Sequence, residues 1–203
     1  MKKNFLVILT LVGIQQINAQ FTRRDSLQGG LRIERTSYDV KRYDLNITIN
    51  PEQKNIKGFN DITFEVIVPT QKIQLDLFEN MKVDSIVWNT KKLKYIRDND
   101  AVFIDFPEKL ASKSNHKLKF YYSGNPRIAR NAPWDGGFVF SKDKAGKDFI
   151  AVAVQGTGAS LWYPVKDSQT DEPDNGASIK VAVPNGLMNV SNGRFLGSQD
   201  LKN

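Results

Sequence analysis

Most of the chain alternates between apolar and polar residues with a period of two, the pattern of half-buried β-strands. The alternation begins with Tyr43, Leu45, Ile47 and Ile49. Further alternating segments follow, with turn residues between them, at 56–68, 73–77, 83–88, 93–95, 102–106, 118–122 and 179–183. Many short strands separated by turns predict an all-β chain, built as an antiparallel β-sandwich or saddle.

The stretch from Phe149 to Asp174 departs from this alternation. It begins with a continuous apolar run that ends at Val154, and such a run predicts a strand buried on both faces. Gln155 follows, then the flexible sequence Gly156-Thr157-Gly158 and two aromatic residues. A polar residue at the end of a buried strand, next to flexible backbone and aromatic rings, is typical of one wall of a binding site.

The N-terminus has the features of a cleaved secretory signal. Lys2 and Lys3 precede an apolar run, and Ala19 provides a small residue before a cut at Gln20. We therefore expect a signal peptide at residues 1–19, a flexible leader at 20–34 and an exported protein, periplasmic or extracellular. The apolar run is too short to span a bilayer, so we expect no stable membrane anchor. Since the chain has no cysteine, disulfides and a lipoprotein anchor are excluded.

The charge pattern gives little reason to expect a nucleic-acid partner. The 203 residues include 29 lysines and arginines against 22 aspartates and glutamates, a net charge of +7. The basic residues are scattered among acidic ones on the polar positions of the predicted strands. Scattered charge of this kind is typical of a solvated face rather than of a nucleic-acid site.

Few residues offer catalytic chemistry. His116 is the only histidine, and one imidazole without thiolates does not make a zinc site. Gly156-Thr157-Gly158 lacks the third glycine of a dinucleotide loop, and Trp162 replaces the last glycine of a nucleophile elbow. Four acidic residues lack the spacing of a calcium loop, and we expect a solvated turn for them: Asp167, Asp171, Glu172 and Asp174.

Three stretches, in order, resemble the N-terminal domain of zinc aminopeptidases of the aminopeptidase N type, a family that includes leukotriene hydrolase. Tyr38–Phe64 contains a Tyr-x-Leu-x-Ile strand that turns into a Gly-x-x-x-Ile-x-Phe strand. Ile73–Phe78 resembles the next strand of the family. Gln155–Pro173 resembles the family segment that contains a glutamine, an alanine, an aromatic residue and a proline.

This resemblance implies the β-saddle of the zinc aminopeptidase N-terminal domain at residues 35–203, incomplete at its C-terminus. The family's saddle packs on a thermolysin-like catalytic domain, whose H-E-x-x-H helix and Gly-x-Met-Glu-Asn strand are not in this sequence. Zinc is therefore expected only in that domain, with no cofactor in this chain, which alone should not hydrolyse peptides. The chain would then be either the front part of a longer enzyme or a truncated relative. The implied activity of the whole enzyme is removal of N-terminal residues from peptides.

The resemblance also assigns candidate substrate-binding residues. Gln155 matches the family glutamine that lines the substrate cleft, and an amide can hold both the free amine and the backbone of a peptide's first residue. Thr157 and Gly158 stand where many relatives have Glu or Gln and then Ala. Thr157 cannot supply a negative charge, so its part in amine recognition stays open. For Gln155 the alternative is a strand-end amide that is satisfied locally.

A second hypothesis is a stand-alone, non-catalytic β-sandwich that binds peptides or glycans. Its ligand would lie on an aromatic platform, for which the candidates are Trp134, Trp162 and Tyr163. An H-E-x-x-H motif encoded beyond Asn203 would favour the aminopeptidase hypothesis. A soluble monomer that binds a ligand without metal would favour the second.

Overall fold

A computed structural model describes residues 21–201, so the predicted signal peptide lies outside the described residues. The helical elements are α1 (Arg23–Gly29), α2 (Ile33–Thr36) and the 3-10 turn η1 (Ala159–Leu161). The strands are β1 (Tyr38–Asn50), β2 (Asn55–Val66), β3 (Thr70–Asp76), β4 (Lys82–Trp88), β5 (Lys91–Lys92), β6 (Lys94–Asp98), β7 (Ala101–Leu110), β8 (Asn115–Gly124), β9 (Gly137–Lys142), β10 (Asp148–Ala153) and β11 (Ala177–Ala182).

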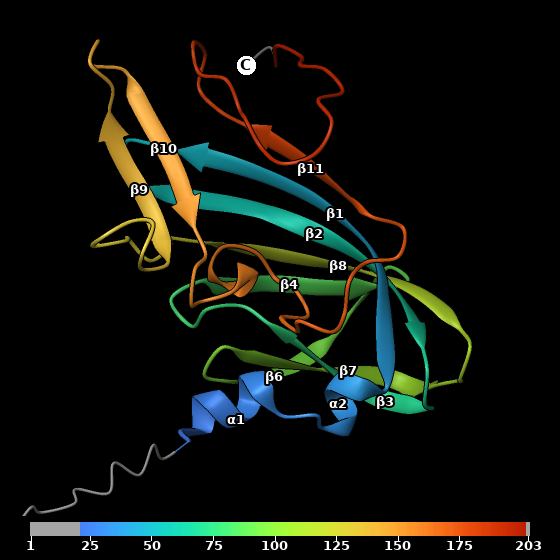
Figure 1. Cartoon of the computed structure of the whole chain (residues 1–203). Helices are drawn as coiled ribbons and strands as arrows, with labels where there is room; N and C mark the ends of the chain where they lie inside the picture. Colours follow the sequence, from blue (N-terminus) through green and yellow to red (C-terminus); the bar gives the residue numbers. More distant parts are fainter. Residues whose placement is uncertain (1–20, 202–203) are drawn as a thin grey trace, which may run out of the picture.

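These strands form one large sheet and two small ones. The large sheet has the order β11-β1-β2-β8-β4-β5, and the smaller sheets are β3-β7-β6 and the β9–β10 hairpin. All pairs of these strands are antiparallel except β1 with β11, which run parallel. The long strands curve side by side, with β3-β7-β6 near one end and the hairpin near the other (Figure 1). The predicted all-β fold is confirmed.

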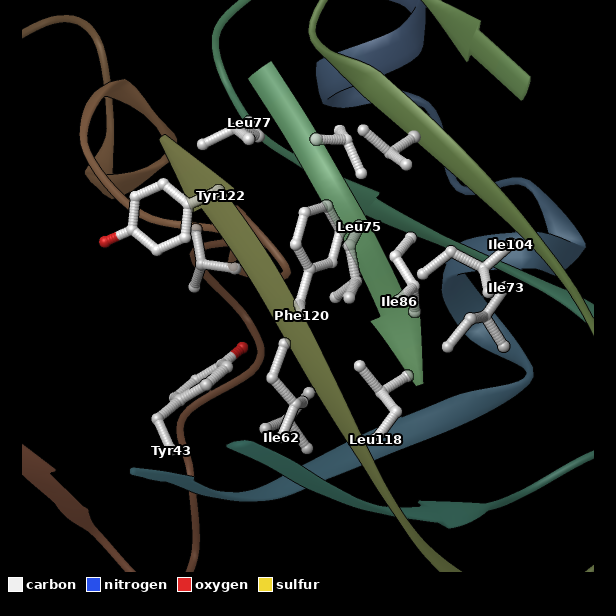
Figure 2. Packing of buried hydrophobic residues seen from close by; sticks show 14 of the residues in the cluster. Tyr43, Ile62, Ile73, Leu75, Leu77, Ile86, Ile104, Leu118, Phe120 and Tyr122 are labelled. Carbon is white, nitrogen blue, oxygen red and sulfur yellow. The ribbon is translucent and has the colours of Figure 1, made fainter. Parts of the chain in front are cut away.

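The core lies between the large sheet and the β3-β7-β6 sheet. Alternate residues of β2 and β8, among them Ile62, Leu118 and Phe120, point inward and meet Ile73 and Leu75 of β3 (Figure 2). All five side chains are fully buried. Their period of two in the sequence is therefore the period of the pleat, which places every second side chain on the buried face.

Residues 23–29 form α1, although the sequence pattern predicted a flexible leader there. Thr22 caps the helix, since its side chain accepts from the backbone N–H of Asp25, and Leu27 is buried beneath it. Arg23 pairs with Asp98, and the Arg24 guanidinium lies 5.0 Å from the ring of Phe78. A helix of two turns is too short to show a periodic apolar stripe, so only the capping box marked it in the sequence.

The described residues contain no helix that is both long and apolar enough to cross a membrane.

Candidate functional site

The three candidate substrate-binding residues, Gln155, Thr157 and Gly158, lie at one end of the β9–β10 hairpin. The pairing of β9 with β10 places Gly137 opposite Ala153 at this end. The loop of residues 130–136 enters the hairpin there, and the turn of residues 154–158 leaves it. The two connections are therefore neighbours in space, although about twenty residues separate them along the chain. We call this place the hairpin end.

The run from Phe149 to Val154 is not buried on both faces, so this prediction was wrong. Phe149 is 55% exposed, and Val152 and Val154 are each 40% exposed. Ile150 packs against the core. The hairpin has only two strands, so one of its faces rests on the core while the other has no layer over it among the described residues. A continuous apolar run shows that a strand is apolar on both faces, but not what covers each of them.

The turn after β10 is closed on the carbonyl of Val154. This oxygen accepts from the backbone N–H of Thr157 at 3.1 Å and of Gly158 at 3.0 Å. The Thr157 hydroxyl donates to the same oxygen at 3.1 Å. Gly156 has a φ of +69°, a left-handed conformation that glycine adopts without steric cost. These bonds leave Gln155 exposed at the tip of the turn.

Thr157 and Gly158 fix the position of this turn through close contacts. A Cβ added to Gly136 would lie 2.0 Å from the Thr157 hydroxyl oxygen, so the side chain of Thr157 rests on the backbone of the neighbouring loop. Gly158 has a φ of +80°, and an added Cβ there would lie 2.0 Å from a carboxylate oxygen of Asp167. The glycine is thus required both by its backbone conformation and by its close contact with Asp167.

Asp167 ties the turn to the segment that follows it. Its carboxylate accepts from the hydroxyl of Ser160 at 2.6 Å. The carbonyl of Ser160 in turn accepts from the backbone N–H of Phe78 at 2.8 Å, which attaches the segment to the chain that leaves β3. Further along, the carbonyl of Pro164 accepts from the buried amide of Asn60 at 2.9 Å. The turn is therefore supported by the segment of residues 160–167, which is hydrogen-bonded to the saddle.

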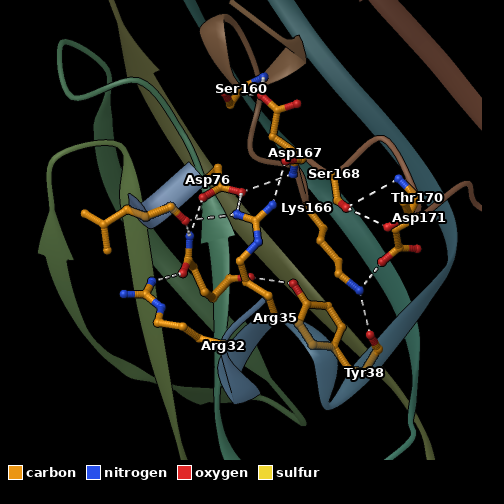
Figure 3. A network of polar contacts seen from close by, with 12 residues as sticks. Arg32, Arg35, Tyr38, Asp76, Ser160, Lys166, Asp167, Ser168, Thr170 and Asp171 are labelled. Atoms are coloured by element: carbon orange, nitrogen blue, oxygen red, sulfur yellow. Dashed lines mark hydrogen bonds and ion pairs between the residues drawn. The ribbon is translucent and has the colours of Figure 1, made fainter. Parts of the chain in front are cut away.

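A buried ion pair lies beneath this supporting segment (Figure 3). Arg35 and Asp76 are 2.7 Å apart, and each side chain is 4% exposed. Arg35 also donates to the carbonyl of Asp167 at 2.6 Å, and the backbone N–H of Asp167 donates to Asp76 at 3.1 Å. Gln74 donates to the other oxygen of Asp76 at 2.6 Å. The network joins the N-terminal segment, β3 and the segment carrying the site.

Burial raises the pKa of Asp76 to about 6, although Arg35 and Gln74 oppose the rise. Because the carboxyl loses most of its hydration in the fold, its charged form depends on these partners. A change in the charge of Asp76 or Arg35 should therefore alter the position of Asp167 and of the turn that contacts it.

Of the four acidic residues expected in a solvated turn, Glu172 and Asp174 are exposed, whereas Asp167 and Asp171 are not. Asp171 is paired with Lys166, and the two side chains are 4% and 9% exposed. Asp171 also accepts from the backbone N–H of Val40 at 3.3 Å, and Asp174 pairs with Lys41 at 2.6 Å. These carboxylates fasten the segment to β1. The sequence did not indicate these pairings because β1 lies about 130 residues away.

The aromatic platform of the second hypothesis is not assembled. The rings of Trp162 and Tyr163 meet edge to face, with centroids 4.7 Å apart, and both pack against the core. Phe138 meets Trp162 in the same manner at 6.4 Å. Of the three aromatic residues proposed for the platform, only Trp134 is well exposed, at 71%. A flat surface of stacked rings for a sugar is therefore not formed.

The described residues do not fit a zinc ion. Residues 21–201 contain no group of three or more histidine, cysteine, aspartate or glutamate side chains that could hold a metal. The imidazole of His116 lies between Phe64 and Trp88, with ring centroids 5.6 Å from each, and bonds to the hydroxyl of Ser114 at 2.8 Å. Partial burial lowers the pKa of His116. It has the surroundings of a residue at the edge of the core.

Sequence reasoning identified the turn but missed the residues that support it. Arg35, Asp76 and Gly136 were not singled out, because their contacts join segments far apart in the chain. The one available local signal was the pair Gly136-Gly137, since two adjacent glycines often mark a close approach of backbone.

Comparison with solved structures relates this fold to known enzymes. An M1 zinc metallopeptidase from Deinococcus radiodurans, solved as a mutant bound to a Tyr-Ser-Ala substrate, matches 78% of this chain with 21% identity and a TM-score of 0.54. Leukotriene A4 hydrolase from Saccharomyces cerevisiae matches 73% with 15% identity and a TM-score of 0.57. The matched regions cover 37% and 24% of those two proteins. At these identities the likeness shows a shared fold.

A search of curated proteins found no match to this chain. The family model of the peptidase M1 N-terminal domain matches residues 39–203, which is most of the chain. The resemblance drawn from the three sequence stretches is thereby confirmed. This chain belongs to the peptidase M1 N-terminal domain family.

Proposed function

We propose that this chain is the N-terminal domain of an exported zinc aminopeptidase, which removes N-terminal residues from peptides, and that its hairpin end forms one wall of the substrate cleft. The observation that carries the proposal is the family match over residues 39–203 together with the exposed amide of Gln155 on a fixed turn. The matched regions span only 37% and 24% of the metallopeptidase and hydrolase named above, which leaves room for a catalytic domain elsewhere.

The proposed partners are a catalytic domain of the same enzyme and the N-terminus of a peptide. Phe149 supports a contact with such a domain, because it is 55% exposed and lies on the face of β10 opposite Ile150, which packs against the core. Covering this apolar side chain would be favourable. Zinc would be held by the catalytic domain, since the described residues of this chain do not fit it. Export is proposed on the signal-like N-terminus.

In this proposal Gln155 binds the first residue of the peptide. Its carbonyl oxygen accepts a hydrogen bond from the free amine, and its N–H₂ group donates to the backbone carbonyl of the same residue. We give Thr157 a different task, because its side chain packs against the backbone of Gly136 and its hydroxyl donates to the carbonyl of Val154 within the turn. We assign Thr157 and Gly158 to the shape of the wall, with their contacts to Gly136 and Asp167 holding Gln155 in place.

Activity measurements on two lengths of the protein test this proposal. The polypeptide that carries both this domain and the catalytic domain should hydrolyse alanyl-4-nitroanilide and lose the activity when a chelator removes zinc. Residues 20–203 alone should show neither turnover nor stoichiometric zinc. Turnover by residues 20–203 with one zinc per chain would place catalysis within this domain and refute the proposal.

A further inference from the structure

A second exposed side chain stands at the hairpin end beside Gln155. Trp134 lies on the loop of residues 130–136, which enters β9 at Gly137, and Gln155 lies on the turn that leaves β10 after Ala153. Gly137 and Ala153 are paired, so both connections start from the same pair of residues. The contact of Gly136 with Thr157 shows that the loop and the turn touch. Trp134 is only two residues from that contact.

The loop that carries Trp134 is held in one shape. The carboxylate of Asp135 accepts from the backbone N–H groups of Arg130 and Asn131, each at 2.7 Å. The backbone N–H of Trp134 donates to the carbonyl of Asn131 at 2.9 Å. These bonds close a small ring of backbone around Asp135, so the backbone that carries the indole is set before any ligand arrives.

The base of the loop is fixed as well. The backbone N–H of Ala129 donates to the carbonyl of Phe138 at 3.0 Å. The backbone N–H of Phe138 donates to the carbonyl of Arg127 at 2.7 Å. Phe138 is buried and stacks on Phe140 within the hairpin. The loop therefore starts and ends on ordered backbone, and Trp134 projects from its middle.

The exposure of Trp134 is unusual for so large an apolar side chain. The domain leaves 71% of it in contact with solvent, although burying an indole is favourable. Ile128, which is bridged to Phe138, is 46% exposed, and Val154 at the start of the turn is 40% exposed. The hairpin end thus presents apolar side chains next to a few polar ones, the amide of Gln155 and the exposed side chains of Arg130 and Asn131. This composition is that of a small-molecule or peptide subsite.

We propose that Trp134 forms a second wall of the cleft and contacts the side chain of the substrate's first residue, so that the enzyme favours an apolar residue there. The inference rests on the proposed function, in which Gln155 holds the amine and backbone of that residue. With the backbone of that residue held at Gln155, we place its side chain toward Trp134, because the loop and the turn touch at Gly136 and Thr157. An indole face offers a wide apolar contact and a single donor, so it selects for size and apolarity rather than for charge.

Substrate selectivity tests this role in the complete aminopeptidase. In Trp134→Ala, the ratio of kcat/KM for leucyl-4-nitroanilide to that for alanyl-4-nitroanilide should fall about tenfold, the effect of losing one apolar contact to the larger side chain. Trp134→Phe should retain most of the ratio, because it keeps an aromatic face.

Ile96→Ala is the matched control. Ile96 is also a large apolar side chain, 60% exposed, but it lies on β6, where it pairs with Phe103, outside the β9–β10 hairpin. It should leave the ratio unchanged. If Trp134→Ala lowers kcat/KM for both substrates equally, Trp134 contacts the catalytic domain or supports the fold, and the inference is overturned.

Gln155→Ala separates this inference from the proposal on which it rests. If Gln155→Ala lowers kcat/KM for both substrates while Trp134→Ala leaves the ratio unchanged, the proposed function stands and the role of Trp134 fails. If neither variant changes kcat/KM for either substrate, the hairpin end is not part of the cleft, and both fail together.

Discussion

Gln155→Ala is expected to lower kcat/KM for alanyl-4-nitroanilide by about 10- to 100-fold in the complete aminopeptidase proposed above. The side chain is exposed on a turn whose own hydrogen bonds do not need it, so its loss should leave the fold intact. A hydrogen bond to a charged amine contributes about 1.5–3 kcal/mol, and the loss of that bond accounts for the range. Steady-state kinetics with zinc content measured in parallel would show the effect.

Gln53→Ala provides the control for Gln155→Ala. Gln53 is an exposed glutamine in the turn between β1 and β2, where its backbone N–H donates to Asn50. Its replacement should change kcat/KM by less than about twofold, as is usual for an exposed residue outside a binding site. If Gln155→Ala also changes kcat/KM by no more than this, the amide of Gln155 does not touch the substrate.

Arg35→Met is expected to destabilise the domain by about 3–5 kcal/mol at neutral pH. The substitution keeps an apolar stem of similar length but leaves Asp76 buried without its cation, which is the costly way to break a buried pair. The carbonyl of Asp167 also loses its donor, so the base of the turn should loosen. Urea unfolding of residues 20–203, followed by circular dichroism, would measure the free energy of unfolding.

The stability that Arg35→Met loses should also depend on pH. Asp76 has a pKa of about 6 in the fold, above the usual value of 3.8, so the folded state binds the proton more tightly. Its contribution to stability therefore falls as pH rises from about 4 to about 6. Removal of Arg35 raises this pKa further, because the guanidinium is the main group that opposes the rise. The deficit of Arg35→Met should then be larger at pH 7.5 than at pH 4.5.

Arg42→Met is the matched control for this substitution. Arg42 pairs with Asp44 at 2.8 Å, but the two side chains are 39% and 24% exposed, and such pairs contribute less than about 1 kcal/mol. The double variant Arg35→Met/Asp76→Leu should recover part of the stability, since no unpaired charge remains buried. An Arg35→Met domain as stable as Arg42→Met at both pH values would show that the buried network does not support the fold.

The strands of the saddle could be predicted from the sequence because each carries its own signal. Leu118 and Phe120 alternate with lysines, and in the fold their side chains are buried in the core. In a long segment, a clear period of two indicates which face of the strand is buried, whichever strand it pairs with. The same holds for β2, where Ile62 and Phe64 lie on the inner face.

Contacts between distant segments could not be predicted in this way. Arg35 and Asp76 are 41 residues apart, and neither has a local feature that indicates a buried pair. The neighbourhood of Trp134 and Gln155 depends on the register of the β9–β10 hairpin, in which Gly137 pairs with Ala153. The sequence indicates two paired strands there but does not specify their register. The run from Phe149 to Val154 was predicted to be buried on both faces because its composition is apolar throughout, whereas burial also requires a covering layer.

A crystal structure of the complete polypeptide with a non-hydrolysable tripeptide would show whether this domain holds the N-terminus of the substrate. An amide atom of Gln155 should lie within about 3.2 Å of the amine or the backbone of the first residue, at the hairpin end. A peptide bound at the zinc with the turn of residues 154–158 turned away from it would show that this domain does not hold the substrate.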